Sequence, residues 1–159
     1  MTKRGVHLVG VNHQYQIGPH GTIPVEATLE DFAEFGSFLR GVIARYAIRG
    51  IAEEMSLFAL KKHFVSGHSF PHRVATELEL PHRYCDPDAD TQKALNITST
   101  EQRERYWIKE LITFNAFPVL FILGADHIDS FQQLLLESAL KPFVAARDWQ
   151  PSSLRNANI

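Results

Sequence analysis

Apolar residues along this chain gather in short runs that alternate with amphipathic stretches. The run at 119–123, which follows Phe117 and Pro118, is too short to cross a membrane and is typical of a strand buried on both faces. Shorter runs predict further strands at 6–11, 50–54, 82–85 and 143–146.

Between these runs, apolar residues recur every three to four positions, which predicts helices. The clearest helix begins near Thr28, a plausible N-cap with Glu30 and Asp31 in the first turn, and runs to about Ile48 before Gly50 closes it. Further helices are expected at 56–64, at 100–115 and after His127. Residues 74–80 fit a helix or a strand, and we favour the helix.

Strands separated by helices predict an α/β protein, a three-layer α/β/α fold with a mostly parallel sheet. The chain has 159 residues, of which 45% are hydrophobic, enough for one substantial core. We therefore expect a single domain over 1–150 and a C-terminal tail over 151–159, although the strand order cannot be read. In such folds the residues just after the strands share one cleft.

Charge and cysteine content narrow the class of partner. There are 16 basic and 18 acidic side chains, so nothing draws the whole chain toward nucleic acid or a membrane surface. The first apolar run is interrupted before it would serve as a signal peptide, and the single cysteine, Cys85, cannot form an internal disulfide. We expect a cytoplasmic protein that takes a small-molecule substrate or ligand, in an oligomeric state that the sequence does not indicate.

Two predicted strands end in the same motif, Gly-x-x-His, at 10–13 and at 124–127. A single Gly-x-x-His motif is typical of a tight turn in which the histidine side chain only forms a hydrogen bond with the backbone. Two copies with acids between them favour a functional site containing His13 and His127. Glu53 and Glu54 are the last two residues of the predicted strand at 50–54. Adjacent strand residues point to opposite faces, so at most one of them faces the cleft.

Imidazole and carboxylate groups are the ligands that zinc, manganese, iron and cobalt accept. We predict a divalent metal ion held by His13, His127 and Glu54, with Glu53 as the alternative carboxylate. Asp86 and Asp88 fit either a turn or additional catalytic acids. No other histidine is expected in a His-x-x-x-His pair on a helix, but His20 and His68 stay candidates because loops carry them.

The segment 12–26 contains two prolines and two glycines and is long for a loop in a compact domain. Because long loops beside a predicted site often act as lids, we expect it to form a movable cover over the cleft.

The motifs Gly10-Val11-Asn12-His13, Ile51-Ala52-Glu53-Glu54 and Gly124-Ala125-Asp126-His127 together resemble the TIKI/TraB group and its relatives, the erythromycin esterases and the haem-binding ChaN-like proteins. The resemblance implies a hydrolase-like site, metal-dependent in some members. It also implies an acidic motif, matched here by Asp86-Pro87-Asp88, with Arg83 in place of the arginine that commonly adjoins it.

Three functions follow from this candidate site. The first is a metal-dependent hydrolase in which Glu53 or Glu54 is a ligand or general base and the metal activates water. The second is a binding protein whose histidines hold haem or a small ligand without turnover. The third is a regulatory module that binds a metabolite.

Overall fold

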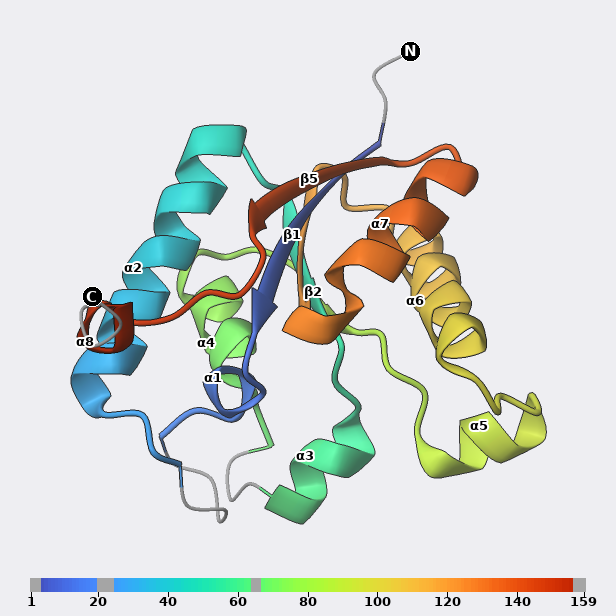
Figure 1. Cartoon of the computed structure of the whole chain (residues 1–159), viewed down its shortest axis with the longest axis horizontal. Coiled ribbons are helices and arrows are strands. Elements are labelled where there is room, and N and C mark those ends of the chain that lie inside the picture. Colours follow the sequence, from blue (N-terminus) through green and yellow to red (C-terminus); the bar gives the residue numbers. More distant parts are fainter. Residues whose placement is uncertain (1–3, 20–24, 64–66, 156–159) are drawn as a thin grey trace.

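The computed structural model describes residues 4–19, 25–63 and 67–155, and it contains a five-stranded parallel sheet (Figure 1). The strand order is β3-β2-β4-β1-β5. The strands are β1 (Gly5–Val11), β2 (Gly50–Glu53), β3 (His82–Tyr84), β4 (Val119–Gly124) and β5 (Lys141–Ala146). The predicted α/β class with a parallel sheet is confirmed.

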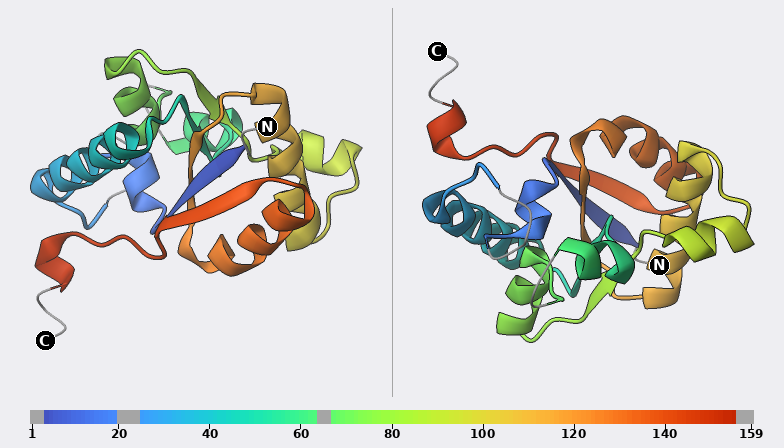
Figure 2. Two further views of the ribbon diagram at one scale, coloured as in Figure 1. Left: turned by 90° about the horizontal axis from the view of Figure 1, so that it is seen from above. Right: turned by 90° about the horizontal axis from the view of Figure 1, so that it is seen from below.

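Helices cover both faces of the sheet, as the two turned views also show (Figure 2). One face carries α2 (Leu29–Tyr46) and α4 (Phe70–Glu77), and the other carries α6 (Thr100–Phe114) and α7 (Ile128–Glu137). The shorter helices are α1 (Gln14–Ile17), α3 (Leu57–His63), α5 (Ala89–Ala94), the 3₁₀ turn η1 (Ala125–His127) and α8 (Ser152–Arg155). Within the described ranges, no helix is both long and apolar enough to span a membrane.

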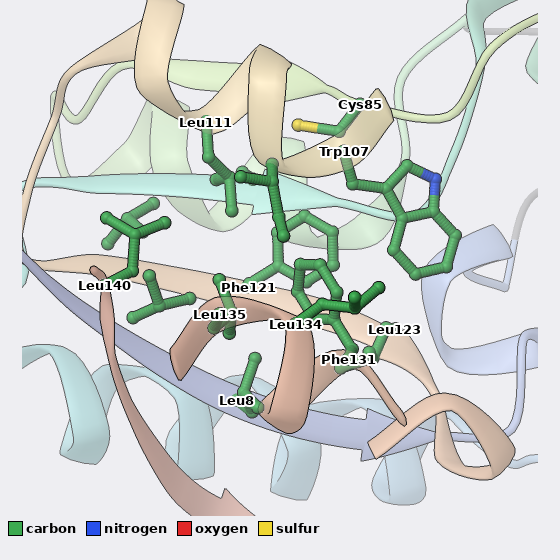
Figure 3. Packing of buried hydrophobic residues seen from close by; sticks show 14 of the residues in the cluster. Leu8, Cys85, Trp107, Leu111, Phe121, Leu123, Phe131, Leu134, Leu135 and Leu140 are labelled. Atoms are coloured by element: carbon green, nitrogen blue, oxygen red, sulfur yellow. The ribbon is translucent and has the colours of Figure 1, made fainter. Parts of the chain in front are cut away.

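Side chains of β4 alternate between two apolar cores. Phe121 and Leu123 pack with Trp107 of α6 and Phe131 of α7 (Figure 3). The alternate residues Leu120 and Ile122 belong to the core under α2 and α4. Every residue of β4 is buried, as predicted for the run at 119–123, and the strand lies in the centre of the sheet.

The predicted start of the first long helix is confirmed, and its end lies two residues before the predicted Ile48, but the prediction that Gly50 closes it is wrong. Thr28 caps α2 by accepting from the Asp31 amide at 3.1 Å, and the Asp31 carboxylate accepts from the Thr28 amide. The helix ends at Tyr46 with Ala47 in the left-handed conformation, whereas Gly50 is the first residue of β2. A Cβ on Gly50 would lie 2.7 Å from the Ala116 Cβ, so this glycine permits a close approach of two segments.

Two short helices were not predicted from the sequence. Asn12 Oδ1 accepts from the Gln14 amide at 3.1 Å and starts α1, which buries Tyr15 and Gln16. Asp88 caps α5 by accepting from the Thr91 amide at 2.7 Å. Such turns are made by local hydrogen bonds and leave little apolar periodicity to detect. The remainder of the predicted cover includes residues 20–24, which lie outside the described ranges, as does His20.

The end of the described chain returns to α2. Arg155 of α8 donates to Glu34 Oε1 at 2.9 Å, and the Ser152 amide donates to the same oxygen at 2.8 Å. Leu154 remains half exposed. The segment that we expected as a tail therefore contains a helical turn held by polar contacts rather than by apolar burial.

Candidate functional site

Glu54 lies at the centre of a polar network at the carboxyl ends of β2 and β4. Its amide donates to the Ile122 carbonyl at 2.8 Å, so the backbone stays paired with β4 one residue beyond β2. Its side chain is 3% exposed. The Gly124 amide donates to Oε1 at 2.8 Å, and Arg103 donates to Oε2 at 2.8 Å. This buried carboxylate thus has a donor on each oxygen and a cation beside it.

Both histidines of the Gly-x-x-His motifs turn their Nε2 atoms toward this carboxylate. His13 Nε2 lies 4.0 Å from Oε1 of Glu54, and His127 Nε2 lies 3.5 Å from Oε2. They differ in exposure, with 53% of the His13 side chain exposed and 17% of the His127 side chain. The two motifs, 114 positions apart in the sequence, therefore meet on one carboxylate because β1 and β4 are neighbours.

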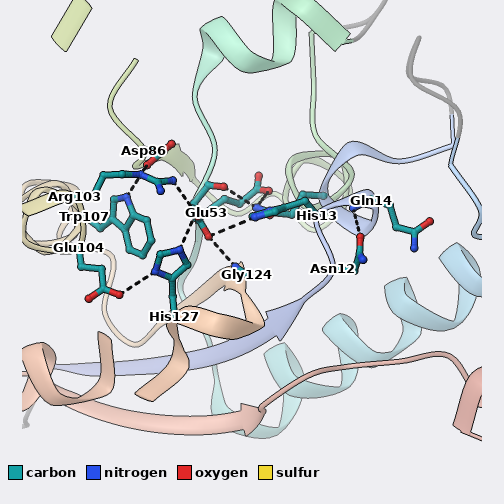
Figure 4. Close-up of polar contacts among 12 residues, drawn as sticks. Asn12, His13, Gln14, Glu53, Asp86, Arg103, Glu104, Trp107, Gly124 and His127 are labelled. Atoms are coloured by element: carbon teal, nitrogen blue, oxygen red, sulfur yellow. Dashed lines mark hydrogen bonds and ion pairs between the residues drawn. The ribbon is translucent and has the colours of Figure 1, made fainter. Parts of the chain in front are cut away.

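His127 lies between two carboxylates and against an indole (Figure 4). Its Nδ1 is 3.0 Å from Oε1 of Glu104, which is buried and also accepts from the Ser130 hydroxyl. The Trp107 ring packs edge-on against the imidazole at 5.0 Å. The hydrogen bond that His127 donates to Glu104, reinforced by the charge of Glu54, raises the pKa of His127 despite its partial burial. The imidazolium form of His127 is therefore more stable than that of a free histidine side chain.

Gln16 fixes the protonation pattern of His13. Its Nε2 donates to Oε1 of Glu53 and to the Glu54 carbonyl, both at 3.1 Å, so its amide oxygen must face the other way. That oxygen lies 2.7 Å from Nδ1 of His13, so the proton of the neutral ring is on Nδ1. Nε2 of His13 is then left with a lone pair directed at the cleft.

Asp86 holds the guanidinium of Arg103 in place. Arg103 Nε and Trp107 Nε1 both donate to Oδ1 of Asp86 at 2.9 Å (Figure 4). Because Arg103 bonds Asp86 through Nε and Glu54 through Nη2, its plane cannot rotate without breaking one contact. Asp86 therefore belongs to the network as the residue that orients the cation.

The structure separates the two neighbouring glutamates. Glu53 is fully buried on the opposite side from the histidine pair, where it accepts from Ser69 and lies 2.6 Å from Nε2 of His82. His72 stacks on His82, and burial together with the charges of His82 and His68 lowers the pKa of His72 to about 4. Glu54 is the glutamate that faces the histidine pair.

Two predicted site residues lie outside the network. Asp88 caps α5, and its hydrogen bond from the Thr91 backbone lowers the pKa of its carboxyl. Arg83 donates to Oε2 of Glu110 at 2.8 Å instead of reaching Glu54. The arginine that contacts Asp86 and Glu54 is Arg103 of α6.

Four residues of the network were not predicted from the sequence: Gln16, Arg103, Glu104 and Ser130. For Glu104 alone, the sequence contained a pattern that could have indicated its role. Glu104, Ile108 and Leu111 share one helix face by their spacing, and all three are buried. A carboxylate on the apolar face of a helix needs a polar partner, here His127. Gln16 gave no such signal, because its role depends on a contact with the distant β2.

A cleft of about 300 Å³ opens beside His13 at the ends of β1 and β4. Its lining contains three other polar side chains, those of Asn12, Asp126 and Asp148, and the backbone of Gly124. A Cβ on Gly124 would lie 3.1 Å from Nε2 of His13 and 3.3 Å from Oε1 of Glu54. The glycine of this motif therefore leaves space between the imidazole of His13, which lines the cleft, and the carboxylate of Glu54, which lies behind it.

The donor types for a metal ion are present, but they are not assembled as a ligand set. Across 4–19, 25–63 and 67–155, no group of three or more His, Cys, Asp or Glu side chains is arranged to hold a metal ion. Both oxygens of Glu54 already accept hydrogen bonds, one from the Gly124 amide and the other from Arg103. The positive charge of Arg103 also disfavours the binding of a metal cation at the same carboxylate. Metal binding by His13, His127 and Glu54 stays a prediction.

Comparisons with known proteins assign neither a family nor a function to this chain. No family model matches the chain, and no curated protein or solved structure matches it. The likeness to the TIKI/TraB group accordingly rests on the two Gly-x-x-His motifs and the strand-end glutamate, and it stays a prediction.

Proposed function

We propose that this protein is a hydrolase of small polar molecules, with a histidine pair around Glu54 as its active site. The observation that carries the proposal is the convergence of two imidazoles, each delivered by the end of a different strand, on opposite oxygens of one buried carboxylate. Sites of this kind combine a proton acceptor, a proton donor and a fixed charge, which hydrolysis requires.

His13 is the general base in this proposal. Its Nε2 carries the lone pair, and at 4.0 Å from Glu54 it is too far for a direct hydrogen bond, so it is free to accept a proton from water in the cleft. The imidazolium formed in that step is stabilised by the negative charge of Glu54. Gln16 keeps the ring in the orientation that the step needs.

His127 is the general acid. His127 does not line the cleft itself, and its Nε2 faces Glu54. Its raised pKa increases the imidazolium fraction near neutral pH, so a proton is available for a leaving group that extends from the cleft toward Glu54. The hydrogen bond to Glu104 and the edge of Trp107 restrict rotation of its ring. Arg103 offsets the charge of Glu54, which lies between the acid and the base.

The cleft indicates the class of substrate. Its volume of about 300 Å³ is at the lower end for small-molecule sites, and Asp126 and Asp148 add carboxylates to its lining. A small substrate with hydroxyl or amino donors matches these acceptors, whereas a strongly anionic one would be repelled. We therefore expect esters or amides of polyhydroxylated or amino compounds.

A metal-dependent form of the same reaction is the second candidate. The observation that favours it is the anchoring of both Nδ1 atoms, by Gln16 and Glu104, since histidine ligands of metals are commonly held in this way. A bound divalent ion would supply an activated water. Removal and return of the metal separates this candidate from the metal-free form.

A chromogenic panel of carboxylic esters, amides and phosphoesters tests the proposal, together with the variants His13→Ala, His127→Ala and Glu54→Gln. We expect hydrolysis of the ester or amide class, lowered about 10²–10⁴-fold by each variant, while Asp88→Asn retains full rate. Phe121→Ala is the control for folding. Loss of that fully buried ring should lower the free energy of unfolding by about 3–5 kcal/mol, and His127→Ala should lower it much less.

Three results would overturn or redirect the assignment. Full activity in both histidine variants would show that the motifs are structural turns. Activity lost in chelator and restored by zinc or manganese would favour the metal-dependent form. A Soret band that disappears in His13→Ala or His127→Ala, with no turnover of any substrate, would support the predicted haem-binding protein instead.

A further inference from the structure

A second group of histidines lies beside Glu53, separate from the histidine pair around Glu54. His68 precedes α4, His72 lies in its first turn, and Tyr84 ends β3. Nδ1 of His68 is 3.0 Å from Nδ1 of His72, which is 2.8 Å from the Tyr84 hydroxyl oxygen. His68 and His72 are four positions apart, but the pair straddles the helix start, so they do not form a pair within a helix.

Hydrogen bonding alone does not account for these contacts. A ring nitrogen has one in-plane direction for hydrogen bonding, as a donor or as an acceptor, yet Nδ1 of His72 faces two partners. The Tyr84 oxygen also accepts from the Ser69 amide at 3.1 Å. At least one contact of His72 is therefore left without a well-formed hydrogen bond.

The separations do suit ligands of a common metal ion. Imidazole nitrogens bound to one ion at about 2.0–2.1 Å lie about 2.8–3.4 Å apart for ligand angles between about 90° and 109°. The 3.0 Å between the nitrogens of His68 and His72 falls in this range, as does the 2.8 Å between His72 and Tyr84. The two imidazoles are nearly perpendicular, at 85°, with centroids 4.5 Å apart. The rings thus meet at their Nδ1 edges instead of stacking.

We propose that His68 and His72 bind a divalent transition metal ion of the zinc, nickel or copper class through their Nδ1 atoms, with the Tyr84 oxygen at a third position and water completing the shell. Imidazole is a preferred ligand of these ions. The site uses two histidines and a tyrosine, so it agrees with the lack of any three-member His, Cys, Asp or Glu group in the described part of the chain. It does not depend on the proposed hydrolase.

The surroundings support the proposed metal site. His72 stacks on His82, with 7° between the ring planes and 4.2 Å between centroids, which holds the ligand ring in place. Behind it lies the buried carboxylate of Glu53, 2.6 Å from Nε2 of His82, which contributes negative charge. His68 is exposed, so an ion has access from solvent. Binding would tie the start of α4 to β3.

The test uses the whole protein after treatment with chelator and buffer exchange. Zinc and nickel are titrated by calorimetry, and zinc is also followed by the shift of the thermal midpoint, since a ligand of the folded state raises it. We expect about one equivalent of zinc, bound at least tenfold more weakly by His68→Ala and by His72→Ala. Tyr84→Phe should weaken binding less, because it removes only the third position.

His13→Ala and His127→Ala are the matched controls, and they should keep the full zinc affinity and the full thermal shift. Loss of zinc binding in either control, with retention in His68→Ala, would overturn the proposed site and assign the ion to Glu54 and its histidine pair. Absence of zinc and nickel binding would also overturn it. His68→Ala keeps the test free of folding effects, because the His68 side chain is exposed.

Discussion

The amide of Gly124 donates a hydrogen bond to Oε1 of Glu54 at 2.8 Å, which links the last residue of β4 to the residue that follows β2. The same glycine leaves the space in which His13 Nε2 approaches that oxygen. The second Gly-x-x-His motif therefore supplies a donor and an open space through its glycine, and a titratable ring through His127.

Arg103 and Arg83 offer a matched comparison, because their side chains are 29% and 33% exposed and each pairs with a carboxylate. Arg103→Met should lower the free energy of unfolding by about 1–3 kcal/mol, since it leaves the buried Glu54 carboxylate without its cation. Arg83→Met should cost about 1 kcal/mol or less. Urea unfolding of both variants measures the difference.

Only Arg103→Met should also reduce hydrolysis. Equal stability losses in the two variants would show that the Arg103 contact with Glu54 is no stronger than a surface ion pair. Normal hydrolysis in Arg103→Met would remove Arg103 from the proposed site.

Gln16 should act as a positioning residue for His13. Gln16→Met keeps the length of the buried side chain but removes the acceptor for Nδ1, so both ring tautomers become available. We expect hydrolysis to fall about 10–100-fold, as for other residues that orient a working histidine, and the acid limb of the pH profile to shift. Gln14→Met, on the same helical turn, is the control.

The Gln14 side chain accepts hydrogen bonds from the amides of Glu26 and Ala27, and no hydrogen bond joins it to the His13 ring among those the structure describes. Its variant should therefore keep the pH profile of the wild type. If the two glutamine variants have the same rate and the same profile, Gln16 has only a structural role.

The pH dependence of stability should carry a contribution from His127. Because the folded-state pKa is raised by Glu104 and Glu54, folding favours the imidazolium, and this contribution is complete below the unfolded value of about 6.5. It is lost as the pH rises from there through the folded pKa. The difference in unfolding free energy between wild type and His127→Gln should therefore shrink with increasing pH.

Chemical unfolding at a series of pH values between about 5.5 and 9 measures this difference. Taking the difference between the two proteins cancels the titration of the other histidines. A difference that stays constant, or grows, with increasing pH would mean that the contact with Glu104 does not favour the charged ring.

Periodicity predicted the layers of this fold because burial produces a pattern of apolar residues within each strand and each helix, which can be read from the local sequence. Every residue of β4 is apolar up to Gly124, and the helices on either side keep apolar faces toward the sheet. The strand order could not be read from any local pattern, since the pairing of β1 with β4 joins segments over a hundred positions apart. The convergence of His13 and His127 depends on that pairing.

The choice between Glu53 and Glu54 shows the same limit. Alternation along β2 places Ile51 and Glu53 on the face of α2 and α4, and Ala52 and Glu54 on the face of α6 and α7. The sequence predicted that the two glutamates diverge but not which face receives the histidines. The short helix α1 also escaped prediction, and with it Gln16, because it is a single turn.

The two motif glycines should respond differently to the same substitution. A Cβ on Gly10 would lie 2.0 Å from the Arg147 carbonyl oxygen, and backbone cannot move aside cheaply. Gly10→Ala should therefore cost about 1–3 kcal/mol of stability or more. Gly124 has φ of −59°, which alanine adopts readily, and its new methyl group would meet His13, whose side chain is half exposed.

Gly124→Ala should accordingly lower the unfolding free energy by less than about 1 kcal/mol while reducing hydrolysis at least tenfold, because the methyl group pushes Nε2 of His13 away from Glu54. Urea unfolding and initial rates on the same preparations measure both quantities. Should Gly124→Ala lose stability without losing rate, the glycine would be a packing requirement like Gly10, and the proposed active site would lose the feature that distinguishes it from a pair of turns.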